Sequence, residues 1–253
     1  MSFIITVYVP EAIVMASDSR QSIIIKRSVP EEAKQQAVET INSDFVYKTF
    51  LLTKQGVGIS TFGESILEKV TIESHMKRFQ EERLKDGDDI LSIAQKLLDF
   101  FSQQFPNART AFHVAGFLKE SRKSVPYIYH CQVSRNEIRR LNSKQGTDEV
   151  VYGASWGGQG DIIAGILGAS QKIGPNVGIE QNAKAPVVWD AMPVQDAVDF
   201  AIYAVRTTID TIRFQARPKN VGGPIDVLLL TPGKSCWVQR KEYRGQTTNL
   251  LST

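Results

Sequence analysis

The first twenty residues constrain this chain most. Two apolar, β-branched runs, at residues 3–9 and 12–16, are separated only by Pro10-Glu11. Such runs on either side of a Pro-containing break predict a hairpin of two buried strands. The second run ends abruptly in Ser17-Asp18-Ser19-Arg20, so we expect Asp18 at the edge of the core, where a carboxylate needs a partner. The sequence therefore predicts a cation that meets Asp18.

Composition indicates an ordinary soluble globular protein. The 253 residues are 42% hydrophobic and 23% charged, which suits a single domain that buries a large core. The net charge is only +3, and no basic stripe predicts nucleic-acid binding. No run approaches the roughly 18 apolar residues of a membrane span, and the start lacks the features of a secretory signal. We expect a cytoplasmic protein in which Cys131 and Cys236 are small buried hydrophobes.

Local patterns predict strands and then two helices in the first half of the chain. Apolar runs indicate strands at residues 21–26, 45–52 and 55–62. Apolar residues at helical spacing predict one helix from 63 to about 84, and a second between Asp88-Asp89 and Pro106. The polar stretch 27–44 carries helix formers without apolar periodicity. It is therefore either a surface excursion or a short helix.

The second half repeats this order. Its most regular helix is predicted at 193–215, and a small-residue helix at 162–170. The loop 171–192 is equally consistent with a functional lid or interface and with decoration. Strands are predicted at 110–118, 126–133, 137–141, 149–153, 221–232 and 235–239. Strands alternating with pairs of helices suit two packed antiparallel sheets with helices on both outer faces.

Two further features could indicate a ligand. The glycine-rich run 155–161 precedes a helix, and phosphate can bind at such a position. Its glycines match neither the G-x-G-x-x-G spacing nor the P-loop spacing of nucleotide-binding proteins. A tight strand-to-helix turn is the favoured interpretation. The three histidines, His75, His113 and His130, stand apart without metal-ligand spacing, so we predict no metal and no cofactor.

A family resemblance is carried by three segments. Read from Ser2 without a gap, SFIITVYVPEAIVMASDSR resembles the amino terminus of the proteasome β-subunit group of N-terminal nucleophile hydrolases, which includes the bacterial HslV peptidase. In that group a Thr, Ser or Cys nucleophile is followed sixteen positions later by an acid, and here 18 − 2 = 16 separates Ser2 from Asp18. Lys48 resembles a lysine that the family has on a strand beside the nucleophile, although the loop before Lys48 is longer in this chain than in the family. The run GGPIDVLLLTP at 222–232 resembles the strand after its last long helix.

The resemblance implies a fold and a set of partners. It implies an α+β fold, the four-layer αββα sandwich, as one proteasome-subunit-like domain over residues 1–253. Insertions at about 27–44 and 171–192 and a polar tail at 241–253 would be additions to it. The expected partners are a peptide or protein substrate and further copies of the chain, in a ring or a smaller oligomer. An ATPase unfoldase of the kind that HslV uses stays open, and neither nucleic acid nor a membrane is expected.

Elementary chemistry gives each predicted site residue a role. A serine hydroxyl needs a base, and an α-amino group with a pKa of about 7.7 to 8.0 suits that task near neutral pH. Ser2 would supply both groups once Met1 is removed. Lys48, in an apolar wall beside Asp18, would favour loss of the hydroxyl proton, and Asp18 would fix Lys48 and offset its burial. The resemblance places an oxyanion donor at the backbone N–H near Thr61.

Other residues depart from the family pattern. Pro218 and Val221 stand where an Asp and a Ser are expected, and Gly158 or Gln159 stands where another Ser is expected. Taken singly, an Asp after a strand is usually a turn residue, and a Lys in a strand usually reaches for water. The sequence therefore leaves two hypotheses: a threonine-peptidase-like amidohydrolase that uses Ser2, or a catalytically inactive subunit of the same fold with a structural, assembly or partner-binding role.

Overall fold

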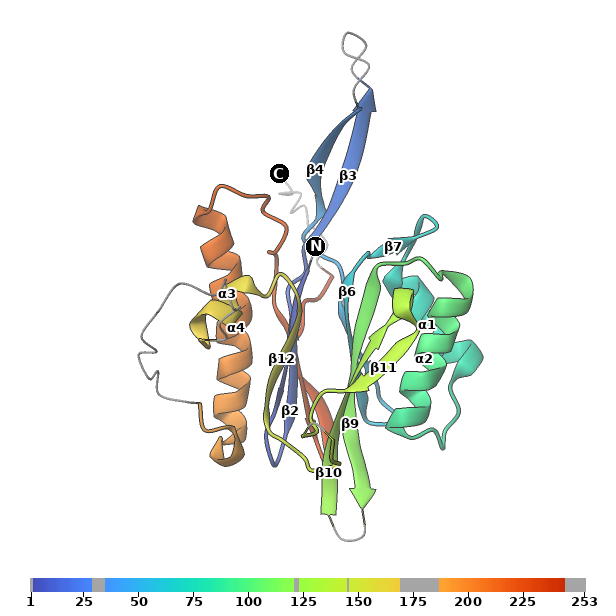
Figure 1. Cartoon of the computed structure of the whole chain (residues 1–253), viewed down its shortest axis with the longest axis vertical. Coiled ribbons are helices and arrows are strands. Elements are labelled where there is room, and N and C mark those ends of the chain that lie inside the picture. The colour runs from blue at the N-terminus through green and yellow to red at the C-terminus, as the bar shows by residue number, and fades with distance from the viewer. Residues whose placement is uncertain (1, 29–34, 121–122, 145, 169–186, 244–253) are drawn as a thin grey trace, which may run out of the picture.

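The computed structural model describes residues 2–28, 35–120, 123–144, 146–168 and 187–243. Two five-stranded antiparallel sheets form its centre, with the orders β12-β1-β2-β13-β14 and β11-β10-β9-β6-β5 (Figure 1). The strands of the first sheet are β1 (Phe3–Tyr8), β2 (Ile13–Ser17), β12 (Gly153–Gly158), β13 (Asp226–Thr231) and β14 (Lys234–Gln239). Those of the second are β5 (Thr49–Leu52), β6 (Val57–Gly63), β9 (Thr110–Glu120), β10 (Lys123–Gln132) and β11 (Glu137–Arg140).

The predicted N-terminal hairpin is confirmed at the centre of the first sheet. β1 and β2 pair antiparallel from Ile4 opposite Ser17 to Tyr8 opposite Ile13, and every residue of both strands is buried. One face of the hairpin packs against helix α4 (Val194–Phe214), while Tyr8, Ile13 and Met15 belong to a cluster that reaches the second sheet. Burial on both faces explains why both strands are continuously apolar.

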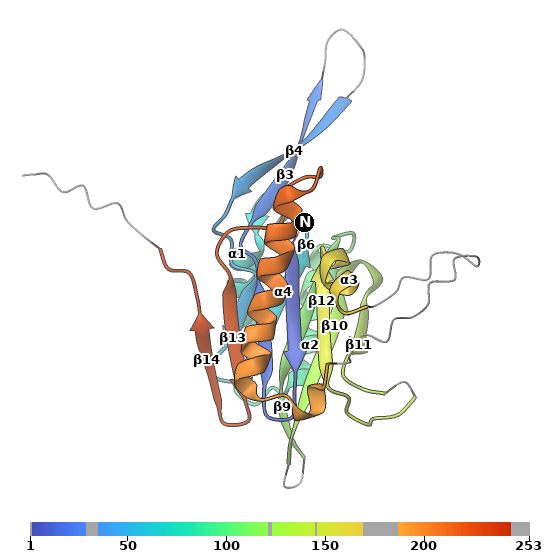
Figure 2. The ribbon, with the colours of Figure 1, turned by 90° about the vertical axis from the view of Figure 1, so that its left-hand side faces the viewer.

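All four predicted helices have counterparts among the described residues, and α2 and α4 follow their predicted bounds most closely. Helix α4 lies across the first sheet, as Figure 2 shows, and its apolar residues pack against β1 and β2. Helix α2 (Ile90–Gln104) packs against β9 and β10, and its N-cap Asp89 accepts a 2.7 Å hydrogen bond from the backbone N–H of Ser92. Helix α1 (Ile72–Arg83) begins nine residues after the predicted start at 63. The remaining short elements are α3 (Asp161–Ile166) and the 3-10 turns η1 (Val133–Arg135) and η2 (Trp189–Ala191).

The predicted fold class, an α+β four-layer αββα sandwich, is wrong for the described chain, which is mostly antiparallel β structure. Its described residues form fourteen strands in four sheets but only four α-helices, and α3 has six residues. The unexpected sheets are two-stranded: β3 (Gln21–Ser28) pairs with β4 (Gln35–Ser43), and β7 (Ile66–Leu67) pairs with β8 (Val70–Thr71). The local pattern predicted a helix or a loop for these segments. Their backbone N–H and C=O groups instead form hydrogen bonds to a paired strand.

The three predicted additions have different outcomes. Within 27–44, the described part is the β3–β4 hairpin rather than a helix, and this hairpin projects beyond the two large sheets (Figure 1). Most of 171–192 lies outside the described residues. In the tail, Lys241 is buried rather than solvent-exposed, and residues 244–253 lie outside the described part. No helix among the described residues is both long and apolar enough to cross a membrane.

A buried histidine between the sheets makes stability depend on pH. His113 on β9 is 1% exposed, and its Nδ1 lies 3.0 Å from the Thr6 hydroxyl. Burial, with additional positive charge from His130 and Arg139, lowers the pKa of His113 to about 3. In the unfolded chain this pKa would be about 6.5, so only the unfolded state gains a proton between these two values.

The contribution of His113 to the free energy of unfolding is therefore expected to be fully present above pH 6.5 and to fall as the pH drops toward 3. The greatest slope for one such group is about 1.4 kcal/mol per pH unit. Urea unfolding of the native protein and of His113→Gln at pH 7, 5 and 4 measures the effect. The Gln variant should lose less stability over this range, and equal losses would contradict the assignment.

Candidate active site

Asp18 accepts four hydrogen bonds just beyond the end of β2. Its Oδ1 accepts from Lys48 Nζ at 2.6 Å and from the backbone N–H of Phe3 at 2.9 Å. Its Oδ2 accepts from the N–H groups of Gly222 at 3.0 Å and Arg20 at 3.1 Å. The side chain is completely buried. Asp18 therefore connects the start of the chain, the segment before β5 and the segment before β13.

Lys48 is the predicted cation. Its side chain is 2% exposed, and its ammonium also donates to the carbonyl of Arg20 at 2.6 Å. An ammonium has three donors, and among the described residues only these two acceptors engage them. Burial lowers the pKa of Lys48, while the Asp18 carboxylate opposes this shift. The contact between Asp18 and a cation is confirmed, and its catalytic role stays a prediction.

Ser2 is linked to this pair through the residue that follows it, Phe3. It is 4% exposed, and its carbonyl accepts a 2.8 Å hydrogen bond from the N–H of Gln159. Gly158 must be a glycine here, because it has φ +84° and a Cβ would lie 1.8 Å from the Ser2 carbonyl oxygen. Since Phe3 follows Ser2, the bond from Phe3 to Asp18 places the Ser2 peptide at the oxygen that Lys48 also binds. Met1, whose removal the hypothesis requires, lies outside the described residues.

Thr61 is close to Lys48, but not in the predicted way. Its backbone N–H donates to the Lys48 carbonyl at 2.8 Å, so this donor is engaged in the sheet instead of being free for an alkoxide. Its hydroxyl, by contrast, is buried and has no hydrogen-bond partner among the described residues. A buried hydroxyl of this kind calls for a partner from water or a ligand. If Thr61 acts at the site, its side chain is therefore the available group.

Sequence reasoning missed an ion pair beside the site. Arg20 makes two parallel bonds to the carboxylate of Asp44, at 2.5 and 2.8 Å, and a third to the Lys219 carbonyl at 2.9 Å. These contacts raise the pKa of Arg20 and lower that of Asp44. Gly222 allows the guanidinium to approach, because a Cβ there would lie 2.6 Å from Arg20 Cζ. The arginine was visible in the SDSR run, but its partner 24 residues away was not.

A second missed ion pair lies on the neighbouring strand. Asp226, the first residue of β13, stands opposite Ser17 and is fully buried. Lys241 contacts it with Nζ, and its backbone N–H donates to Asp226 Oδ1 at 2.9 Å. The only sequence signal was the Asp in the run GGPIDV, since Lys241 stands in a polar stretch.

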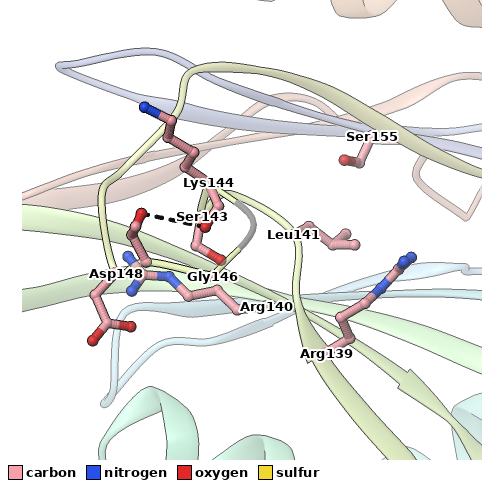
Figure 3. A pocket seen from close by; sticks show the side chains of 9 residues that line it. Arg139, Arg140, Leu141, Ser143, Lys144, Gly146, Asp148 and Ser155 are labelled. Carbon is pink, nitrogen blue, oxygen red and sulfur yellow. Dashed lines mark hydrogen bonds between the residues drawn. The ribbon is translucent and has the colours of Figure 1, made fainter.

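A cavity of 810 Å³ opens elsewhere, beside β11 and the loop that leads to β12 (Figure 3). Its basic side chains point apart: those of Arg139 and Arg140 diverge, and Lys144 points away from both. Lys144 is also paired with Glu149 at 3.2 Å. These cations therefore do not converge on one ligand position, and none of the four predicted site residues lines the cavity. We place the candidate site at Asp18 instead.

Comparison with known proteins supports the fold and no more. No protein-family model matches this chain, and no curated protein matches its sequence. Among solved structures, the chain is similar to a Gly-1 mutant of Anbu from Hyphomicrobium sp. strain MC1, with a TM-score of 0.57 and 12% identity, over 94% of this chain and 87% of that one. At 12% identity this likeness supports a proteasome-like fold, without a specific family or a role.

Proposed function

We propose that this chain is a proteasome-like N-terminal nucleophile hydrolase that cleaves peptide or other amide bonds with Ser2 after removal of Met1. One observation carries the proposal: Asp18 Oδ1 binds both the Lys48 ammonium and the backbone N–H that follows Ser2. This buried acid–lysine pair supports the proposal, because a positive charge near a serine hydroxyl favours loss of its proton.

The reaction follows from the groups present. The Ser2 hydroxyl attacks the substrate carbonyl, and the free α-amino group of Ser2 takes the hydroxyl proton. The Lys48 ammonium stabilises the developing negative charge, while Asp18 keeps Lys48 in position. Collapse of the tetrahedral intermediate breaks the C–N bond, the proton passes to the leaving amine, and an ester to Ser2 remains. Water then hydrolyses this ester and regenerates the hydroxyl.

The inactive-subunit alternative also has a specific observation in its favour. The Thr61 N–H is engaged with Lys48, and Pro218 and Val221 stand at positions where the family pattern has polar side chains. An oxyanion donor would then have to come from another group, such as the Thr61 hydroxyl. Assembly with further copies of the chain and an ATPase partner stay predictions from the resemblance.

Labelling of Ser2 separates the two candidates. Protein made in its natural host is treated with a peptide epoxyketone, which reacts with a hydroxyl beside a free α-amine, and its intact mass is measured. We expect Met1 to be absent and one probe to add per chain.

Two variants control this experiment. Ser2→Ala should not react, whereas Ser19→Ala, which removes a nearby hydroxyl bound to the Pro224 carbonyl at 2.7 Å, should react normally. Met1 retained in all molecules, together with no adduct on Ser2, would eliminate the hydrolase and leave the inactive subunit.

A further inference from the structure

We propose that residues 240–243, the C-terminal strap, hold Lys48 in its working position, with Lys241 and Asp226 as positioning residues of the candidate site. The inference rests on the proposed function, because it assigns a role toward the same lysine. It concerns a part of the chain that the sequence had indicated as a polar tail.

The strap packs on the residues that immediately precede Lys48. The Tyr47 hydroxyl donates to the Lys241 carbonyl at 3.1 Å, and Lys241 Nζ lies 4.2 Å from the centre of the Tyr47 ring. The Tyr243 ring lies 6.0 Å from that of Tyr47, edge-on, and 6.3 Å from that of Phe45. Residues 45 and 47 therefore lie under the strap, while the next side chain, Lys48, reaches Asp18.

The buried ion pair anchors this strap to the sheet. The Lys241 side chain is 1% exposed and that of Asp226 is fully buried, so both charges depend on each other for compensation. Asp226 is opposite Ser17 on β2, one residue before Asp18. Two buried acid–lysine pairs therefore stand on neighbouring strands, and the same short segment, 45–48, contacts both.

The two pairs also interact through their charges. Lys48 faces Asp18 at the end of β2, and the Arg20–Asp44 pair adds one charge of each sign nearby. Burial is the main cause of the lowered pKa of Lys241, and the attraction of Asp226 opposes it. Repulsion by the charge of Lys48 lowers this pKa further. Removing the Lys241 charge would leave Asp226 as an uncompensated negative charge near Lys48. The pKa of Lys48 should then rise, so that it keeps its proton to higher pH.

The test compares Lys241→Met with the native full-length protein. Lysine Cε carbons are labelled with ¹³C, and the titration of Lys48 is followed by NMR, with Lys48→Arg used to assign its signal. We expect the Lys48 midpoint to move to higher pH in Lys241→Met. The rate of Ser2 labelling at pH 7 should fall on the order of 10²-fold, because displacement by about 1 Å costs that much in a preorganised site. Lys241→Arg should restore most of the rate.

Two further variants guard against a purely structural effect. Lys234→Met, an exposed lysine on β14, should change neither readout. Tyr243→Ala removes a ring that is 77% exposed, so it should leave the protein folded and yet slow the labelling.

An unchanged Lys48 titration in folded Lys241→Met would overturn the role of the strap. If Lys241→Met does not fold, unchanged labelling in Tyr243→Ala has the same meaning. If native Ser2 never reacts, the proposed function fails on its own, and the NMR titration still decides whether the strap sets the environment of Lys48.

Discussion

Asp18→Ala is expected to lower the free energy of unfolding by about 3–5 kcal/mol, the range seen when one partner of a buried ion pair is removed. This loss should exceed that of any surface substitution. The carboxylate accepts from three backbone N–H groups and one ammonium, and the variant would leave all four donors without this acceptor. Lys48, at 2% exposure, would also be a buried charge without its counter-ion. Urea unfolding followed by circular dichroism at pH 7 measures the loss.

Two further variants provide losses of stability with which that of Asp18→Ala can be compared. Asp18→Asn keeps the shape and one carbonyl acceptor, so it should lose less than Asp18→Ala. Asp44→Ala removes the other acid near the site, whose side chain is 44% exposed, and should cost less than either. A loss for Asp18→Ala no larger than for Asp44→Ala would show that Asp18 is not the centre of this network.

Lys48→Met is expected to slow labelling of Ser2 by the peptide epoxyketone by about 10²–10³-fold while leaving the protein folded. The methionine fills a similar space but removes the positive charge that pairs with Asp18 and that the proposed function uses, and loss of one electrostatic stabiliser typically costs about 10²–10³-fold in rate. The remaining Asp18 carboxylate would keep three N–H donors, so the loss of stability should be smaller than for Asp18→Ala. Mass spectrometry over time gives the labelling rate, and near-ultraviolet circular dichroism checks the fold.

Lys54→Met is the matched control for this change. Lys54 has a side chain that is 77% exposed, and among the described residues it bonds only to Asp86, across the surface at 3.2 Å. Its replacement should leave labelling unchanged. Labelling of Lys48→Met at the native rate would remove this lysine from the chemistry and favour the inactive subunit.

Elements with a strong local pattern could be predicted from the sequence. The hairpin of β1 and β2 was readable because both strands are apolar throughout, and α4 because its apolar residues recur at helical spacing. Helix α2 was bounded by Asp89 before it and Pro106 after it. In each case a few neighbouring residues contain the whole signal.

Elements defined by pairing with another segment could not be predicted in this way. Residues 35–43 look polar and helix-forming, yet they pair with β3, whose partner residues lie up to 22 positions earlier in the chain. The predicted fold class failed for the same reason, because strands such as β4, β7 and β8 were assigned to loop or helix. Strand pairing is decided by non-local contacts, which local periodicity does not contain.

The residues of the candidate site also differ in whether the sequence could predict them. Asp18 could be predicted as an acid that needs a cation, and the resemblance supplied Lys48 as its partner. Lys241 could not, because a lysine followed by Glu242 and Tyr243 looks like solvent-exposed sequence, and its burial depends on Asp226 on another strand.

The bond between Asp18 and the Gly222 N–H joins positions 204 residues apart. During synthesis, the acid near the beginning of the chain emerges from the ribosome long before this donor. A growing chain therefore lacks this contact of the network until Gly222 has been made, and because domains fold as units, we expect the site to become complete only after that point. For the proposed hydrolase, such timing would delay activity until the acid–lysine pair is held from both ends of the domain.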